Sequence, residues 1–218
     1  MGGIVVIGGG GHARVVIEIL LATKAEVVGF CDPSFSEGEC FGHVACLGDD
    51  GVLERLRADG VEQAIVALGD NGLRCEVALR VRSLGFRLVN AVHPSAQISP
   101  SAILGQGIAI MANVVINAAT TVGDNVIVNT GATVDHDCKI GGGAHIAPGA
   151  HLAGRITVGE QCLIGVGSAV GCGRPLSIGD GAVVGSGSVI IEDVPAYSTV
   201  AGNPANQLKP PARRRTAL

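Results

Sequence analysis

The chain has 218 residues, of which 47% are hydrophobic and only 16% charged, with one tyrosine, four phenylalanines and no tryptophan. The net charge of −4 argues against a nucleic-acid-binding protein, because phosphate recognition needs a clustered excess of lysine and arginine. No apolar stretch approaches the roughly 20 residues that span a bilayer, so we expect no membrane insertion. The single basic run, the three arginines at 213–215, is interpreted as a solvated tail.

The cysteines and the first residues together indicate a cytoplasmic protein. The seven cysteines are an odd number and contain no Cys-x-x-Cys pair, which is typical of a chain kept in a reducing compartment. Residues 1–3 lead directly into an apolar run without the charged segment and cleavage site of a signal peptide. We therefore expect that the protein is not exported.

Residues 1–92 alternate between strand and helix signals. Apolar runs predict strands at 4–7, 27–31, 63–68 and 87–92, and amphipathic patterns predict helices at 12–21, 50–58 and 73–84. Such a β-α-β series favours a small parallel sheet with helices on its faces, which is a Rossmann-like α/β domain.

A glycine loop lies between the first predicted strand and the first predicted helix. Gly8 to Ala13 match Gly-x-Gly-x-x-Ala, and Asp32 ends the next predicted strand. In dinucleotide-binding proteins this pattern places a phosphate on the helix N-terminus and an acid on the ribose. The same geometry suits NAD or the diphosphate and ribose of a nucleotide sugar, and the small size of the domain speaks against NAD.

From Ile98 onward an aliphatic residue returns at every sixth position. All thirteen sites are Ile, Leu or Val, at 98, 104, 110, 116, 122, 128, 134, 140, 146, 152, 158, 164 and 170. The period resumes at Ile178, Val184 and Ile190, after a segment with two extra residues at 171–177. The position after each aliphatic residue is often Gly, Asn or Asp, as expected where a corner needs a positive φ.

A six-residue period predicts a parallel β-helix in which each hexapeptide forms one side of a triangular prism. Three hexapeptides close one coil, so residues 18 apart stack in one column and the aliphatic residue points inward. We therefore predict a left-handed β-helix domain over 93–218. Its first coil is expected to lie under the N-terminal domain, and its last coil under a cap at 194–208.

Several motifs resemble those of the hexapeptide-repeat acyltransferases. Residues 200–205, Val-Ala-Gly-Asn-Pro-Ala, look like that family's closing motif. The whole chain resembles the sialic-acid O-acetyltransferase group, which includes N-acetyltransferases of nucleotide-linked 4-amino-4,6-dideoxysugars. The matching segments are 8–13, Gly69 with Asn71 and Arg74, 93–96 with 99–101, and 129–137. Within the group, residues 134–138 most resemble the members that act on GDP-perosamine.

The resemblance implies a homotrimer that uses acetyl-CoA as co-substrate, transfers the acetyl group directly and needs no metal. Acetyl-CoA is expected to lie between neighbouring prisms and to contact His145, Val166 and Ser186, although the two-residue insertion leaves the register of Ser186 open. The residues implied for the nucleotide sugar are Gly10, Gly11, His12, Asp32, Gly69, Asn71 and Arg74.

His136 is the residue that we expect to act as general base. An amine that attacks a thioester must lose a proton, and histidine titrates near neutral pH. His136 lies two positions after the inward Val134, and its column neighbours Ala118 and Gly154 are small enough to leave room for the ring. Asp137 follows directly, and in the family an acidic residue at this place assists the base.

Other interpretations remain open. His136 and His145 are also compatible with structural corner residues, whereas His151 has no clear match and Cys138 is disfavoured as an acyl-carrying nucleophile. The same fold would serve an O-acetyltransferase acting on a sugar hydroxyl such as that of sialic acid. It also occurs in zinc lyases of the β-helical carbonic anhydrase type, whose histidine spacing differs from that of this chain. A non-enzymatic scaffold with a nucleotide-sensing domain is the last alternative.

Overall fold

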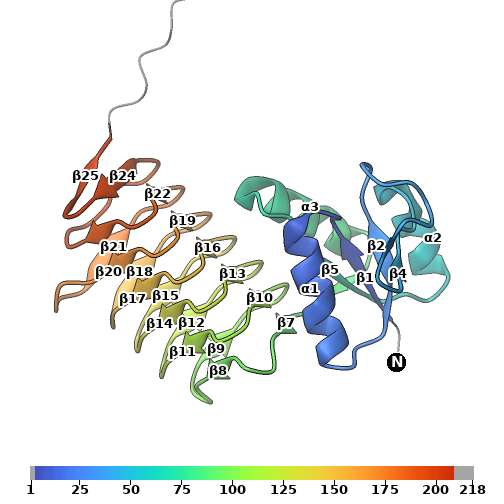
Figure 1. Ribbon diagram of the computed structural model, residues 1–218, viewed down its shortest axis with the longest axis horizontal. Helices are drawn as coiled ribbons and strands as arrows, with labels where there is room; N and C mark the ends of the chain where they lie inside the picture. Colours follow the sequence, from blue (N-terminus) through green and yellow to red (C-terminus); the bar gives the residue numbers. More distant parts are fainter. Residues whose placement is uncertain (1–2, 209–218) are drawn as a thin grey trace, which may run out of the picture.

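The computed structural model describes residues 3–208, which form an α/β part followed by a long three-sided stack of short strands (Figure 1). The arginine run at 213–215 and the last residues of the predicted 93–218 domain lie outside the described range. The predicted combination of a Rossmann-like domain with a left-handed parallel β-helix is confirmed.

The N-terminal part is a parallel sheet with the strand order β2-β1-β5-β6. Its strands are β1 (Ile4–Ile7), β2 (Val27–Cys31), β5 (Gln63–Val66) and β6 (Arg87–Leu88), and a hairpin of β3 (Cys40–Phe41) and β4 (Val44–Ala45) lies beside β2. Its helices are α1 (Gly11–Ala22), a 3-10 turn (Asp50–Val52), α2 (Leu53–Ala58) and α3 (Asn71–Ser83). Residues of β1 alternate between the two faces, so Val6 packs with the α1 side and Val5 with the α3 side.

The predicted strand at 87–92 divides into two elements. β6 stays in the N-terminal sheet, whereas β7 (Ala91–Val92) pairs in parallel with the β-helix. Asn90 explains the division, because its side chain accepts from the N–H of Ile108 at 3.0 Å and donates to the carbonyl of Gly105 at 2.9 Å. The first coil therefore begins two residues before the predicted boundary at 93. The division into independent domains at 1–92 and 93–218 stays a prediction.

The β-helix has three sheets, which we call its first, second and third faces. The first face contains β7, β10 (Ala109–Ile110), β13 (Ile127–Val128), β16 (His145–Ile146), β19 (Leu163–Ile164), β22 (Val183–Val184), β24 (Thr199–Gly202) and β25 (Ala205–Gln207). The second face contains β8 (Gln97–Ile98), β11 (Val115–Ile116), β14 (Thr133–Val134), β17 (His151–Leu152), β20 (Ala169–Val170) and β23 (Val189–Ile190). The third face contains β9 (Ile103–Leu104), β12 (Thr121–Val122), β15 (Lys139–Ile140), β18 (Ile156–Val158) and β21 (Leu176–Ile178).

The faces meet at three edges, which we number by the chain's path around one coil. The first edge follows the first face, the second edge follows the second face, and the third edge returns the chain from the third face to the first. Strand pairing connects residues 18 apart, as in Val134 with Leu152. The two extra residues before Leu176 shift this spacing to 20, and the pairing of Val158 with Ile178 restores the register.

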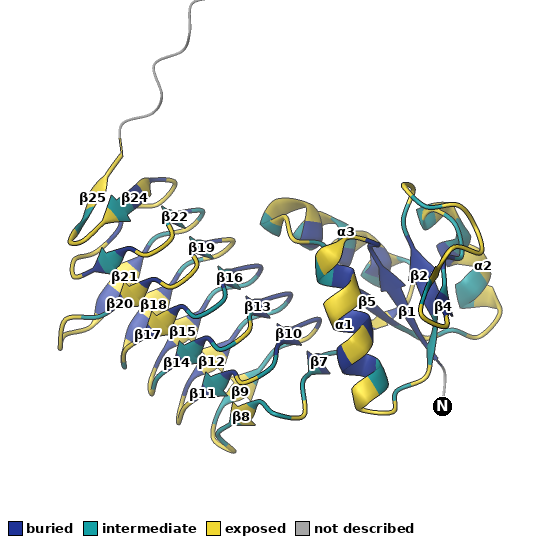
Figure 2. Cartoon of the chain, viewed as in Figure 1, coloured by how far each residue is buried: buried dark blue, intermediate teal, exposed yellow. Residues whose placement is uncertain are grey.

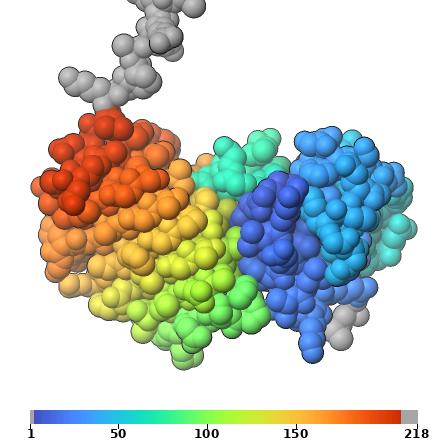
Figure 3. Space-filling view, in the orientation of Figure 1, coloured from blue at the N-terminus to red at the C-terminus, as the bar shows by residue number. Residues whose placement is uncertain are grey.

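The predicted inward side chains fill the prism (Figure 2). Every sixth residue from Ile110 to Val170 is buried, whereas Ile98 and Leu104 in the first coil are only partly buried. One continuous apolar cluster joins α1 to the first coils, and the N-terminal part packs directly against them on the face shown in Figure 3. At the other end, Val194 bridges to Ile178 and the antiparallel pair β24–β25 extends the first face.

The positive φ angles lie two positions later than predicted. At the second edge, for example, the left-handed residue is Asp137, with φ of 58°, and not Asp135, which directly follows the inward Val134. At the third edge the position after the aliphatic residue is always glycine for a steric reason. A Cβ on Gly141 would lie 2.6 Å from the backbone nitrogen of Glu160 in the next coil.

We predict that Gly141→Ala lowers the free energy of unfolding by about 2 kcal/mol, because the added methyl group meets backbone that cannot turn aside. Gly142→Ala is the matched control, since its Cβ would find its nearest atom at 3.5 Å. Urea unfolding of both variants tests this expectation. Equal stabilities for the two variants would contradict the packing argument.

Candidate active site

His136 lies at the second edge of the prism, and its side chain is 52% exposed. Nδ1 lies 2.7 Å from Oδ2 of Asp137. A carboxylate only accepts hydrogen bonds, so this contact assigns the ring proton to Nδ1 and leaves the Nε2 lone pair free. The left-handed backbone at Asp137 turns its carboxylate back toward the ring. The pair therefore has the arrangement that a general base requires.

Small residues in the neighbouring coil make room for the imidazole. A Cβ on Gly154 would lie only 2.5 Å from Nε2 of His136, so the ring lies directly over this glycine. The predicted lack of side chains beside His136 is seen in the structure. Cys138, in contrast, is buried with its thiol donating to the carbonyl of Ala153, and burial raises the pKa of that thiol. A buried, protonated thiol is a poor nucleophile.

The glycine loop has open space where a ligand would lie. A Cβ on Gly10, Gly11 or Gly69 would meet no atom within 4 Å. Gly8, in contrast, has φ of 120° and its Cβ would lie 2.7 Å from the carbonyl oxygen of Ala67, so the fold itself requires that glycine. Gly10 is the N-cap of α1 and makes no side-chain cap, which leaves backbone N–H groups at a helix N-terminus facing the open space.

Asp32 lies beside this loop. Its Oδ2 accepts from the backbone N–H of Gly9 at 2.7 Å, and its Oδ1 accepts from that of Ser34 at 2.8 Å. The carboxylate thus joins the glycine loop to the end of β2. Each oxygen retains a lone pair, which is compatible with the predicted contact to a ribose hydroxyl.

Arg74, which was predicted to contact the nucleotide sugar, has a structural role instead. Its side chain is buried, and all five guanidinium N–H groups have acceptors within the chain. Those acceptors are the carbonyl oxygens of Asn125 (2.8 Å), Leu68 (3.0 Å), Gly69 (3.3 Å) and Gly143 (2.7 Å), and the side-chain oxygen of Asn71 (2.8 Å). No donor is left for a nucleotide sugar, so we assign Arg74 to the junction between α3 and the third edge.

Asn71 shares this structural role. Its side-chain amide donates to the carbonyl oxygens of Gln161 and Cys162, both at 3.0 Å. These groups belong to the third edge of the β-helix. The predicted binding residues therefore separate into two sets, with Gly10, Gly11, His12, Asp32 and Gly69 around the open loop and Asn71 with Arg74 holding α3 on the prism.

His12 and His145 approach each other from the two parts of the chain. Burial, then the charge of Arg74 and then His145 lower the pKa of His12 to about 4. Burial and the charge of Arg74 likewise lower the pKa of His145 to about 4. Both rings are therefore neutral at pH 7. Nε2 of His12 is buried without a hydrogen-bond partner among residues 3–208, whereas Nε2 of His145 accepts from the amide of Asn129 at 3.1 Å.

Val166 and Ser186 occupy one column at the first edge. The pairing of Ile164 with Val184 places Ser186 directly above Val166, and the N–H of Gly187 donates to the carbonyl of Val166 at 2.8 Å. This pairing settles the register that the sequence left open. Val166 is 51% exposed, as a surface contact to a ligand requires.

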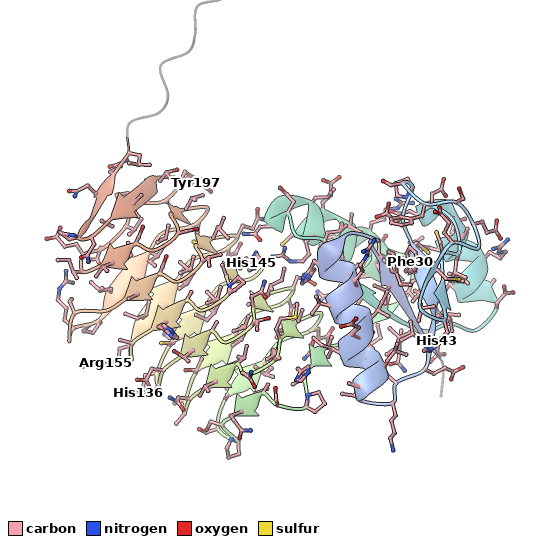
Figure 4. All side chains as sticks on the ribbon, in the orientation of Figure 1. Phe30, His43, His136, His145, Arg155 and Tyr197 are labelled. Carbon is pink, nitrogen blue, oxygen red and sulfur yellow. The ribbon has the colours of Figure 1, made fainter. Side chains whose placement is uncertain are left out.

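The predicted site residues do not meet within one chain. Figure 4 shows His136 and His145 on different sides of the prism, His145 being on the side of the N-terminal part. His136 lies at the second edge, Val166 and Ser186 at the first, and the junction with α3 at the third. Three edges of one prism point in different directions, so one chain alone does not assemble all these groups.

Two features of the site were missed by sequence reasoning. Asn117 donates to Oδ1 of Asp135 at 2.9 Å, directly beside His136, and their separation of 18 residues was a readable signal of contact. Nothing in the sequence alone distinguished the junction role of Arg74 from ligand binding.

None of the helices in the described part of the chain has the length and apolar character of a membrane span. Residues 3–208 contain no group of three or more His, Cys, Asp or Glu placed to hold a metal ion.

We predict that acidification from pH 7 to pH 5 lowers the free energy of unfolding by up to about 2 kcal/mol per histidine at positions 12 and 145. Both histidines gain a proton in the unfolded chain near pH 6.5, but in the folded chain they stay neutral until about pH 4. The stabilisation of the folded chain by these two neutral rings is therefore fully present above pH 6.5 and is lost as the pH falls toward 4. Urea unfolding of wild type and His145→Gln at both pH values measures it, and equal losses in the two proteins would contradict the assignment.

Comparisons with known proteins agree with this geometry. Residues 3–81 match the family model of the PglD N-terminal domain. UDP-N-acetylbacillosamine N-acetyltransferase of Bacillus subtilis (strain 168) is 32% identical over 113 residues, which are 51% of this chain and 52% of that protein. The match thus spans about half the length of this curated relative.

Solved structures match over almost the whole chain. PerB from Caulobacter crescentus, in complex with CoA and GDP-perosamine, is 45% identical with a TM-score of 0.90, covering 96% of this chain and 98% of that one. Histidine-to-asparagine and histidine-to-alanine mutants of that enzyme bind the same two molecules. The acetyltransferase domain of PglB from Neisseria gonorrhoeae FA1090, in complex with acetyl coenzyme A, is 40% identical with a TM-score of 0.87, covering 94% and 98%. The chain therefore belongs to the family of sugar-nucleotide N-acetyltransferases that includes PerB.

Proposed function

We propose that this protein transfers the acetyl group of acetyl-CoA to the 4-amino group of a nucleotide-linked 4-amino-4,6-dideoxysugar. The observation that carries the proposal is the His136–Asp137 pair, an exposed imidazole with a free Nε2 on a prism whose relatives bind CoA. PerB binds CoA and GDP-perosamine together, and the Bacillus subtilis relative is named for N-acetylation of a UDP-linked sugar.

The glycine loop is the proposed site of the nucleotide diphosphate. Backbone N–H groups at the start of α1 donate to the phosphates, and Gly10 and Gly11 let the phosphates approach the backbone closely. Asp32 receives the ribose. Nε2 of His12 is buried without a hydrogen-bond partner among residues 3–208, which supports a ligand at this place, because buried polar atoms in proteins normally have a partner.

His136 acts as the general base of a direct transfer. The amine lone pair forms a bond to the thioester carbon, and the carbonyl π electrons move to oxygen. Nε2 of His136 takes a proton from the nitrogen while Asp137 holds the Nδ1 proton and stabilises the imidazolium. When the tetrahedral intermediate collapses, the C–S bond breaks and the proton passes to the departing CoA sulfur.

A homotrimer brings the separated groups together. The outward residues of the first face are largely apolar and buried or half-buried, such as Leu163 and Val183, whereas those of the second face are mixed, with Val115 and Val189 half-buried and His151 exposed. Those of the third face are mostly polar and exposed, such as Thr121 and Lys139. A ring of copies that joins the first face of one subunit to the second face of the next buries the apolar first face and the valines of the second. It also places His136 of one copy against the His12 and His145 side of its neighbour.

Two further features follow from the proposal. His145, Val166 and Ser186 contact acetyl-CoA in the groove between subunits. We also place the enzyme in the cytoplasm, because all seven cysteines are free thiols, of which two are exposed. No observation favours O-acetylation of a sugar such as sialic acid over transfer to an amine.

We predict that His136→Ala lowers kcat by roughly two to four orders of magnitude while acetyl-CoA binding and the melting temperature stay unchanged, because the exposed ring contributes little to packing. The measurement is acetyl transfer to nucleotide-linked 4-amino-6-deoxysugars with GDP, UDP and dTDP carriers. His43→Ala is the control, since His43 is exposed on the N-terminal part far from the second edge (Figure 4). A His136→Ala enzyme with near-normal turnover would overturn the base assignment.

A further inference from the structure

Asp135 precedes His136 at the second edge, and among residues 3–208 only one of its carboxylate oxygens has hydrogen-bond partners. Oδ1 accepts from the backbone N–H of His136 at 2.8 Å and from the side-chain amide of Asn117 at 2.9 Å. The hydroxyl of Thr120 donates to the Asp135 carbonyl at 2.7 Å. Oδ2 has no hydrogen-bond partner among the residues that the structure describes. Asp135 is therefore fixed in place with one acceptor left over.

The same hydrogen bonds keep Asp135 ionised. The backbone N–H of His136 and the amide of Asn117 hold the pKa of this carboxyl below its usual range. Asp137, by contrast, uses Oδ2 to orient the imidazole. The two carboxylates that flank His136 thus have different environments, and Asp135 is not needed to hold the ring.

The coil above Asp135 and His136 contributes no side chain larger than a methyl group at the two matching positions. The pairing of Val134 with Leu152 places Ala153 above Asp135 and Gly154 above His136. One coil further, Gly171 follows in the Ala153 column. The His136 ring occupies the place over Gly154, and the small residues Ala153 and Gly171 leave the column above Asp135 without a large side chain. The Nε2 acceptor of His136 and the Oδ2 acceptor of Asp135 come from consecutive residues at this edge.

The number of acceptors matches an amine and not a hydroxyl. A neutral amine whose lone pair points at the thioester carbon has two N–H groups, whereas a hydroxyl has one O–H. We propose that Asp135 accepts the second N–H of the substrate's amino group while His136 takes the first, and that this pair of acceptors selects an amine over a hydroxyl. The proposal rests on the N-acetyltransferase function proposed above and names the residue that makes that site specific for nitrogen.

Asp135 gains and loses no proton in this scheme. The ammonium form of the substrate first releases one proton to solvent. The nitrogen lone pair then bonds to the carbonyl carbon, and the nitrogen carries positive charge until His136 removes its proton. The anionic Oδ2 stabilises that charge. Collapse of the intermediate breaks the C–S bond, and the proton on His136 goes to the CoA sulfur.

The Asp135→Asn substitution tests this assignment, because it removes the negative charge of the side chain and keeps its shape. Asp135→Asn retains a carbonyl oxygen that accepts from His136 and Asn117, so the edge is expected to fold unchanged. Because a hydrogen bond to a charged group is lost, kcat/KM for the nucleotide-linked 4-amino sugar should fall roughly 10- to 100-fold. The more decisive readout is the ratio of dissociation constants, with CoA present, for the 4-amino sugar nucleotide and its 4-hydroxy counterpart. Wild type should favour the amine at least about tenfold, and Asp135→Asn should bind the two about equally.

Asp180→Asn is the matched control, because Oδ1 of Asp180 also accepts a backbone N–H, that of Glu160 at 2.8 Å, but at the third edge away from His136. It should keep the wild-type kcat/KM and the wild-type ratio. If Asp135→Asn keeps kcat/KM within twofold, or loses affinity for both ligands equally, the assignment is overturned. Should Asp135→Asn not fold, Asp135→Ala removes the same acceptor, and an unchanged ratio in that variant overturns the assignment as well. A wild-type protein that acetylates no nucleotide amino sugar would refute the proposed function itself and this assignment with it.

Discussion

The whole molecule depends on the packing of an aliphatic side chain into the prism at every sixth residue. This constraint stacks residues 18 apart and thereby decides which side chains share an edge. The second edge carries Asp135, His136 and Asp137, with Asn117 in the coil below and Gly154 in the coil above. The backbone ladder thus orients the proposed base before any ligand arrives, which is the preorganisation that acid–base catalysis requires.

A buried guanidinium is the second constraint, because it decides where the glycine loop lies. Arg74 and Asn71 hold α3 on the third edge through backbone carbonyls of the β-helix. Breaking such a contact would leave a buried charge unpaired, so the junction is expected to be rigid. Burial, and then the same charge, lower the pKa of His12 and of His145 and keep both rings neutral. The glycine loop is therefore fixed near the first face of its own prism and turned away from its own His136.

Most of the fold was predictable because its signals are local or strictly periodic. The inward aliphatic positions, the β2 strand and the space beside His136 followed directly from spacing. The positions of positive φ and the split between β6 and β7 were not predictable, since they depend on how coils stack and on the side chain of Asn90. Asn71 and Arg74 were expected to contact the ligand because of the family resemblance. Only the placement of α3 on the third edge reveals that their hydrogen-bonding capacity is already used.

We propose that each catalytic centre combines the glycine loop of one subunit with His136 of another. The most direct measurement is acetyl transfer by trimers assembled from equal amounts of two inactive chains, His136→Ala and Gly11→Glu, the latter placing a carboxylate where the phosphates are expected. Random mixing should restore about a quarter of the wild-type activity, because one pairing in four joins an intact loop to an intact histidine. Activity no higher than that of the separate variants would show that loop and base belong to the same chain, and would contradict a centre shared between subunits.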